Sequence, residues 1–123
     1  MLIHGTDYPT PDGTCVRDFV HVIGLAEAHV TALRMLMEGT IESQALNLGT
    51  GKGASVREII EVARRATRRE VTATEGLRRE GYPPRLVATA DKASALFDWS
   101  PSHSTVHTIV DTAWNWLKKR KGF

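Results

Sequence analysis

The chain has 123 residues, 41% hydrophobic and 24% charged, which predicts one small globular domain, residues 1–123, with a core of its own. The formal net charge of +2 is too small to indicate a nucleic-acid partner, and no apolar stretch is long enough to span a membrane. A single cysteine, Cys15, excludes an internal disulfide framework, and with no signal-peptide pattern it predicts a cytoplasmic location.

The first half of the chain predicts a loop, a strand, a helix and a second strand. Residues 1–4 form a short apolar stub, and turn-forming residues make 5–13 a loop. Residues 16–22 favour a strand. Apolar residues at helical spacing predict a helix over 25–38, which Gly39 ends. Residues 45–48 predict a short buried strand that leads into a glycine-rich turn at 49–53.

The second half predicts three helices separated by a strand and a loop. Ser55 and Glu58 have the spacing of a capping box, which starts a helix whose arginines face water. Residues 71–74 alternate like a strand, and 77–84 form a loop. Asp91 is predicted to cap a short helix through Phe97, and Thr105 to cap the last helix. The fold class is therefore mixed α/β (α+β), rich in helix, with three or four short strands.

Two of these helices have a predicted inward stripe. In the helix after Ser55, the stripe consists of Val56, Ile59, Ile60, Ala63 and Ala66. In the last helix it consists of Val106, Ile109, Val110, Ala113 and Leu117.

The residues alone give no catalytic or metal site. His103 and His107 stand four apart without further ligands at a suitable spacing, so we expect no metal. Cys15 has no base partner in the sequence and is expected to be unreactive. The glycines of 49–53 match neither phosphate-loop spacing, so a tight turn is the favoured interpretation. Arg17 and Arg79, taken singly, would be solvated cations.

One motif changes the interpretation of these arginines. The run 7–22 contains a valine, arginine, aspartate and aromatic residue followed by histidine and valine: Val16, Arg17, Asp18, Phe19, His21 and Val22. It resembles UDP-glucose 4-epimerases of the extended short-chain dehydrogenase/reductase superfamily, which invert a hydroxyl on a nucleotide-sugar with NAD. Weaker matches at 47–51, 86–93 and 97–101 extend the resemblance from Ile3 to about Trp116. It implies the C-terminal, substrate-binding part of that family.

The resemblance implies a role for three residues. Arg17 and Arg79 stand where the family places arginines against the UDP diphosphate, and a guanidinium can fork two hydrogen bonds onto phosphate oxygens. Tyr82 replaces a family aspartate that bonds the ribose, so it is a weaker candidate for substrate binding. Asp18, His21 and Trp99 are expected to be structural.

The epimerase chemistry is absent from the sequence. Neither tyrosine, Tyr8 or Tyr82, begins a Tyr-x-x-x-Lys motif, and there is no glycine-rich dinucleotide fingerprint. We therefore expect no NAD in this chain, no catalytic residue, a missing NAD-binding front domain and no turnover by the chain alone.

Three functions remain open. The first is a UDP-sugar-binding module, of weak affinity. The second is a structural or interaction protein, which forms a homodimer or complements a separate NAD-binding domain through a face too apolar for water. The third, nucleic-acid binding through the cations of 64–69 and 118–121, is disfavoured by the low net charge.

Overall fold

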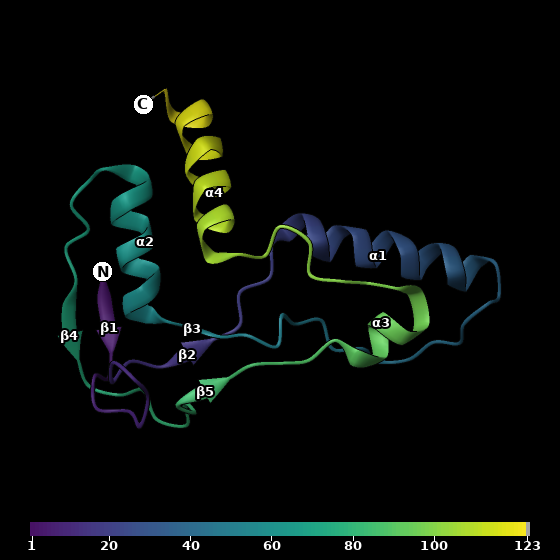
Figure 1. Ribbon diagram of the computed structural model, residues 1–123, viewed down its shortest axis with the longest axis horizontal. Helices are drawn as coiled ribbons and strands as arrows, with labels where there is room; N and C mark the ends of the chain where they lie inside the picture. The colour runs from purple at the N-terminus through teal and green to yellow at the C-terminus, as the bar shows by residue number, and fades with distance from the viewer. Residues whose placement is uncertain (123) are drawn as a thin grey trace.

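Over the described residues the chain folds into four helices and five short strands. The computed structural model describes residues 1–122 (Figure 1). The helices are α1 (Val22–Met37), α2 (Val56–Thr67), α3 (Asp91–Phe97) and α4 (Val106–Lys121). The strands are β1 (Leu2–His4), β2 (Val16–Arg17), β3 (Ala54–Ser55), β4 (Thr74–Gly76) and β5 (Arg85–Leu86). This is the predicted helix-rich mixed α/β class, with five strands in the described residues where three or four were expected.

The strands form two small sheets. β1 pairs with β4 in parallel, with Leu2 opposite Thr74, and the ammonium of Met1 donates to the carbonyl of Thr72 at 2.6 Å. The second sheet has the order β3-β2-β5, in which β2 runs antiparallel to β3 and parallel to β5. In Figure 1 all five strands lie at one end of the molecule with α2, while α1 and α3 lie at the other. α4 packs against α2.

Local capping explains where three helices begin. Ser55 and Glu58 form the predicted capping box: the Ser55 hydroxyl accepts from the Glu58 amide at 3.1 Å, and the Ser55 amide donates to the Glu58 carboxylate at 2.6 Å. Thr105 caps α4 as predicted, accepting from the Thr108 amide at 3.2 Å. At α1 the cap is His21, whose Nδ1 accepts from the Ile23 amide at 3.1 Å. The helix therefore starts at Val22 rather than at residue 25.

Three predicted strands were wrong in whole or in part. Of 16–22, only Val16–Arg17 is a strand, because the following residues turn the chain into the cap of α1. Residues 45–48 form no strand, since no other strand lies beside them to supply hydrogen bonds. The strand expected at 71–74 is instead Thr74–Gly76, where it meets β1.

Two further predictions need correction. The cap of α3 is Ala90, which has no capping side chain, and Asp91 is the first helical residue, where it accepts from the Thr89 hydroxyl at 2.9 Å. In α4 no residue is buried and Ala113 is exposed, so the predicted inward stripe of this helix is only half covered. In α2 the predicted stripe is buried or half-buried, as expected. The arginines expected to face water, Arg64, Arg65, Arg68 and Arg69, are exposed.

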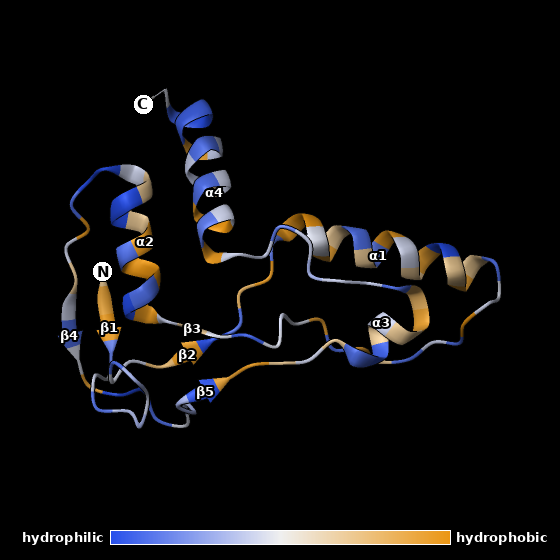
Figure 2. Cartoon of the chain, viewed as in Figure 1, coloured by the Kyte–Doolittle hydropathy of each residue, from blue (hydrophilic) through white to orange (hydrophobic). Residues whose placement is uncertain are grey.

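The core is small for the length of the chain. Trp99, Ala28 and Ala93 form one buried cluster beneath α1, and the indole Nε1–H of Trp99 donates to the Gly24 carbonyl at 2.8 Å. Apolar side chains also line the outer side of α1, where they are exposed. Figure 2 shows apolar residues at several places along this helix. None of the described helices is long and apolar enough to cross a membrane.

Candidate functional site

Arg17, Arg79 and Tyr82 meet beside the loop that precedes β5. The guanidinium carbon of Arg17 lies 5.7 Å from the centroid of the Tyr82 ring, and that of Arg79 lies 5.6 Å from the same centroid. Tyr82 is 48% exposed, so the cluster is open to solvent. This arrangement suits a ligand that has two negative charges for the guanidinium groups and a planar ring that can lie against Tyr82.

A tight turn places Arg79 and Tyr82 next to each other. The Tyr82 amide donates to the Arg79 carbonyl at 3.3 Å, and Gly81 within this turn has φ +75°. That backbone conformation suits glycine, because a side chain would be strained there. Arg79 Nη1 lies 3.4 Å from the Tyr82 hydroxyl, a long hydrogen bond that steers the guanidinium toward the ring.

Arg17 is held by backbone carbonyls. Its Nη1 donates to the Val16 carbonyl at 2.7 Å and to the Pro83 carbonyl at 3.1 Å. The side chain is half-buried, so its position is better defined than that of a fully solvated arginine. Because both bonds use one nitrogen, the Nε–H and Nη2 donors of the fork remain for a ligand.

The neighbouring Arg78 contacts the loop 5–13 instead of Tyr82. Its Nε donates to the Asp7 carboxylate at 2.7 Å, its Nη2 donates to the Asp7 carbonyl, and its guanidinium lies 4.4 Å from the Tyr8 ring centroid. The hydrogen bond from Arg78 holds the pKa of Asp7 below its usual value. Arg78 therefore ties the loop 5–13 to the loop 77–84, and Arg79 rather than its neighbour Arg78 joins Arg17 at the Tyr82 ring.

Asp18 and His21 are structural, as expected. Asp18 accepts from the Thr50 amide at 2.9 Å, from the Thr50 hydroxyl and from the Ala88 amide at 3.2 Å. These bonds fix the glycine-rich turn beside β2. His21 caps α1 through Nδ1, which accepts from the backbone amide of Ile23, and its Nε2 lies 2.8 Å from the Thr112 hydroxyl of α4.

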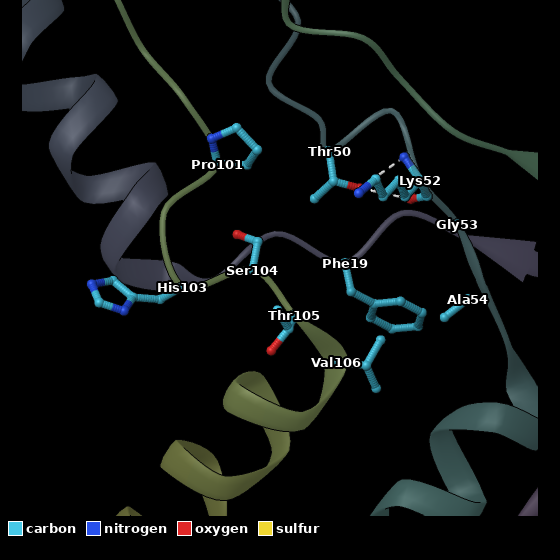
Figure 3. Close-up of a pocket in the computed structure, with 10 residues that line it drawn as sticks. All are labelled: Phe19, Thr50, Lys52, Gly53, Ala54, Pro101, His103, Ser104, Thr105 and Val106. Atoms are coloured by element: carbon cyan, nitrogen blue, oxygen red, sulfur yellow. Dashed lines mark hydrogen bonds between the residues drawn. The ribbon is translucent and has the colours of Figure 1, made fainter.

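A separate cavity of about 420 Å³ lies at the start of α4. Figure 3 shows Phe19 and Val106 pointing toward each other, with Ala54 beside them and with Thr50 and Lys52 at one edge. Arg17, Arg79 and Tyr82 do not line it. With Lys52 as the one lysine or arginine in its lining, the cavity has no pair of cations, so the arginine cluster is the stronger candidate for a diphosphate.

The histidines and the cysteine were the remaining candidates for a metal site or a reactive thiol. Among residues 1–122 there is no group of three His, Cys, Asp or Glu side chains placed to hold a metal ion. His103 lies before α4 with its ring 6.0 Å from that of His21, at an edge-on angle, while His107 lies in α4 and is exposed. Cys15 is a half-buried free thiol.

Comparison with known proteins shows which proteins have a similar sequence and fold. No family model matches the chain. It is 47% identical over 116 residues to a UDP-glucose 4-epimerase of Lacticaseibacillus casei, covering 94% of the chain and 35% of that protein. A crystal structure of UDP-glucose 4-epimerase superposes with a TM-score of 0.90 at 43% identity, covering 99% of this chain and 36% of that one. The chain corresponds to the C-terminal part of UDP-glucose 4-epimerases.

A second solved structure, the UDP-glucose 4-epimerase of Bifidobacterium longum in complex with NAD⁺ and UDP, matches with a TM-score of 0.84 at 34% identity. It covers 99% of this chain and 36% of that one. The chain thus spans about a third of the length of the UDP-glucose 4-epimerases it matches, and the resemblance predicted from Arg17 and its neighbouring motif is confirmed.

Part of the site could not be found from the UDP-glucose 4-epimerase motifs alone. They pointed to Arg17, Arg79 and Tyr82, and the fold brings these three together. They did not reveal the role of Arg78, for which the only sequence signal was an aspartate and a tyrosine in the loop 5–13. They also missed Asp12, which accepts from Thr14 and Ser55 and ties that loop to α2.

Proposed function

We propose that the chain binds a UDP-sugar through its diphosphate, which Arg17 and Arg79 contact with their guanidinium groups. The observation that carries the proposal is the position of the two guanidinium groups, 5.7 and 5.6 Å from the same Tyr82 ring centroid. They come from segments far apart in the sequence, and two cations match the charge of a diphosphate. The UDP bound in the related Bifidobacterium longum structure supports the choice of ligand.

Each residue has its own part in this proposal. Arg17, held at Nη1, offers its Nε and Nη2 hydrogens as a fork to one phosphate. Arg79 is exposed and reaches the second phosphate. Tyr82 offers a ring face and one hydroxyl, and it cannot accept from two ribose hydroxyls as a carboxylate does. The proposed affinity is therefore weak, near the millimolar range, which corresponds to about 4 kcal/mol.

The proposal includes no epimerisation by this chain alone. The reaction needs NAD to take up a hydride and a basic phenolate to take the hydroxyl proton. The sequence has no Tyr-x-x-x-Lys motif and no dinucleotide fingerprint. Any turnover would therefore need a further NAD-binding segment. We infer from the single cysteine that the protein works in the cytoplasm.

Isothermal titration with UDP and UDP-glucose tests the binding proposal. We expect millimolar binding of both ligands, and a loss of about tenfold or more for Arg17→Ala and for Arg79→Ala, since each removes a charge-assisted contact. Arg68→Ala is the matched control, because it removes one positive charge from an exposed position in another part of the molecule. No heat at millimolar ligand, or equal affinities for all four proteins, would contradict the proposal.

A second function is favoured by one observation: large apolar side chains are exposed along α1. The chain would then be an interaction protein, either as a homodimer or as a subunit that complements a separate NAD-binding domain. Light scattering of the chain alone tests the first form, and co-purification with a separately produced NAD-binding domain tests the second. A monomer that captures no such domain and exposes no dye-binding apolar surface would exclude this function.

A further inference from the structure

The C-terminal ends of α2 and α4 make one end of the molecule strongly cationic. α4 packs against α2, and in Figure 1 both helices run toward the same end of the molecule, away from β5. Residues 65–70 and 114–122, which we call the basic end, hold seven of the sixteen lysines and arginines but only one of the fourteen acidic residues. The basic end therefore has a formal charge of +6, and the rest of the chain, at −4, reduces the total to +2.

The two segments of the basic end meet at Trp114. The guanidinium carbon of Arg69 lies 5.1 Å from the centroid of the Trp114 ring, and the ammonium nitrogen of Lys118 lies 5.9 Å from it. Cations that follow one another in two distant stretches of sequence are thus gathered around one indole, and the cluster is a feature of the fold.

A second tryptophan is open to solvent. Trp116 is 58% exposed, and the guanidinium carbon of Arg120 lies 5.2 Å from the centroid of its ring. Lys119 and Arg120 share a side of α4 with Trp116, because they follow it by three and four positions, and all three are exposed. The basic end therefore presents cations together with an accessible indole.

Helix stability explains only a small part of this charge. The C-terminal end of a helix carries the equivalent of about half a negative charge, so two helix ends offset about one cation. Within residues 1–122, no ion pair involves Arg65, Arg68 or the four cations of 118–121. Like charges held close together repel one another, so an anionic partner would stabilise this end of the molecule.

We propose that the basic end binds a membrane surface that contains an anionic phospholipid, phosphatidylserine. Clusters of four to eight lysines and arginines on a helix attract such surfaces, and tryptophan is enriched at the level of the headgroups. The contact is peripheral and needs no membrane-spanning helix. In Figure 1 β2 and β5, beside which Arg17 and Arg79 lie, are at the opposite end, so the proposal is independent of UDP binding.

Two features favour lipid headgroups over nucleic acid. Bases stack on open faces of aromatic rings, and here cations already lie over the rings of both Trp114 and Trp116. The rest of the chain has a net charge of −4, which would repel a long polyanion that reached beyond the basic end. A lipid surface can contact the basic end alone.

Co-sedimentation of the full chain with lipid vesicles tests the proposal. We expect binding to vesicles of phosphatidylcholine mixed with phosphatidylserine, no binding to phosphatidylcholine alone, and weaker binding as salt is added. Replacing Lys119 and Lys121 together by glutamine should weaken binding about tenfold or more, because each cation near an anionic surface contributes roughly fivefold. The matched control replaces Arg34 and Lys92 by glutamine, which removes the same charge from exposed positions in α1 and α3 and should change little.

Tryptophan fluorescence locates the contact. Trp99 is only 6% exposed, so we expect a blue shift on vesicle binding to come from the tryptophans of α4. Trp116→Ala should remove much of the shift and weaken binding several-fold, since the exposed indole enters the headgroup region. Circular dichroism of each variant checks that the helices stay folded.

Three results would overturn the proposal. The first is no co-sedimentation with phosphatidylserine vesicles. The second is an equal loss in the two double variants, which would make binding a matter of total charge. The third is displacement from the vesicles by a single-stranded oligonucleotide at an equal concentration of phosphate groups, which would assign the basic end to nucleic acid. UDP affinity is titrated without vesicles, so failure of either proposal leaves the other standing.

Discussion

The carboxylate of Asp12 joins the loop before β2 to the start of α2. One oxygen accepts from the Thr14 amide at 2.9 Å and from the Thr14 hydroxyl at 2.7 Å, while the other accepts from the Ser55 hydroxyl. Thr14 and Ser55 are both buried, so water cannot replace the missing partner if a bond is lost. Ser55 is also the N-cap of α2, so this carboxylate supports a helix start.

Replacing this residue by its amide, Asp12→Asn, tests how much the junction contributes. The amide keeps one oxygen for Thr14 but places an N–H group where the Ser55 hydroxyl donates. The hydroxyl oxygen, which already accepts from the Glu58 amide, has a second lone pair for the new donor, but the hydroxyl hydrogen loses the carboxylate oxygen to which it donated. One charge-assisted hydrogen bond is lost, and we expect the free energy of unfolding to fall by about 2 kcal/mol. The melting temperature should fall by roughly 8 °C.

The assay is urea unfolding followed by circular dichroism, with Glu70→Gln as the control at an exposed carboxylate. Burial of Asp12 acts to raise the pKa of its carboxyl, but hydrogen bonds from Ser55 and Thr14 outweigh it, so the pKa lies below its ordinary value. A carboxylate with a lowered pKa stabilises the fold above about pH 4, and this contribution is lost as the pH falls through the folded-state pKa.

The difference between wild type and Asp12→Asn should therefore be full at neutral pH and shrink in acid. The difference between wild type and Glu70→Gln should stay small at every pH. Equal unfolding free energies for Asp12→Asn and wild type at neutral pH, or a difference that grows as the pH falls, would refute this account of the junction.

Two further substitutions probe the core and the backbone. Trp99→Phe removes the indole bond to the Gly24 carbonyl and leaves a void in the small core, so we expect a loss of about 2–4 kcal/mol in urea unfolding. Gly13→Ala should cost roughly 2–4 kcal/mol, because φ is +80° and the new Cβ would lie 2.1 Å from the Thr6 carbonyl oxygen. Gly39→Ala has a similar φ of +69° but no atom within 4 Å, so a thermal melt should show a smaller loss, and equal losses would contradict the steric argument.

Local signals in the sequence predicted the helix starts better than the strands. The serine, threonine and glutamate residues that cap α2 and α4 act within one turn, so their spacing alone indicates them. Residues 45–48 have a strand-like composition, but a strand needs a neighbour, and the fold supplies none there. The start of α1 was missed because histidine is an uncommon cap.

The arginine site also depends on contacts between distant segments, which local sequence signals do not predict. Nothing in the residues alone brings Arg17 next to Tyr82, and only the resemblance to UDP-glucose 4-epimerases suggested it. The difference between Arg78 and Arg79 depends on which loop each one reaches. Binding of a UDP-sugar and the single-domain boundary of 1–123 stay predictions.

The ammonium of Met1 lies at the margin of a parallel ladder, where it donates to the carbonyl of Thr72. A peptide N–H at that position can donate the same bond, so added residues would lengthen the first strand rather than dislodge it. Acylating the free amine would keep one donor but remove its charge. An amine-reactive dye attached selectively at this end would therefore report on the docking of that strand, and would be a poor choice as an inert label.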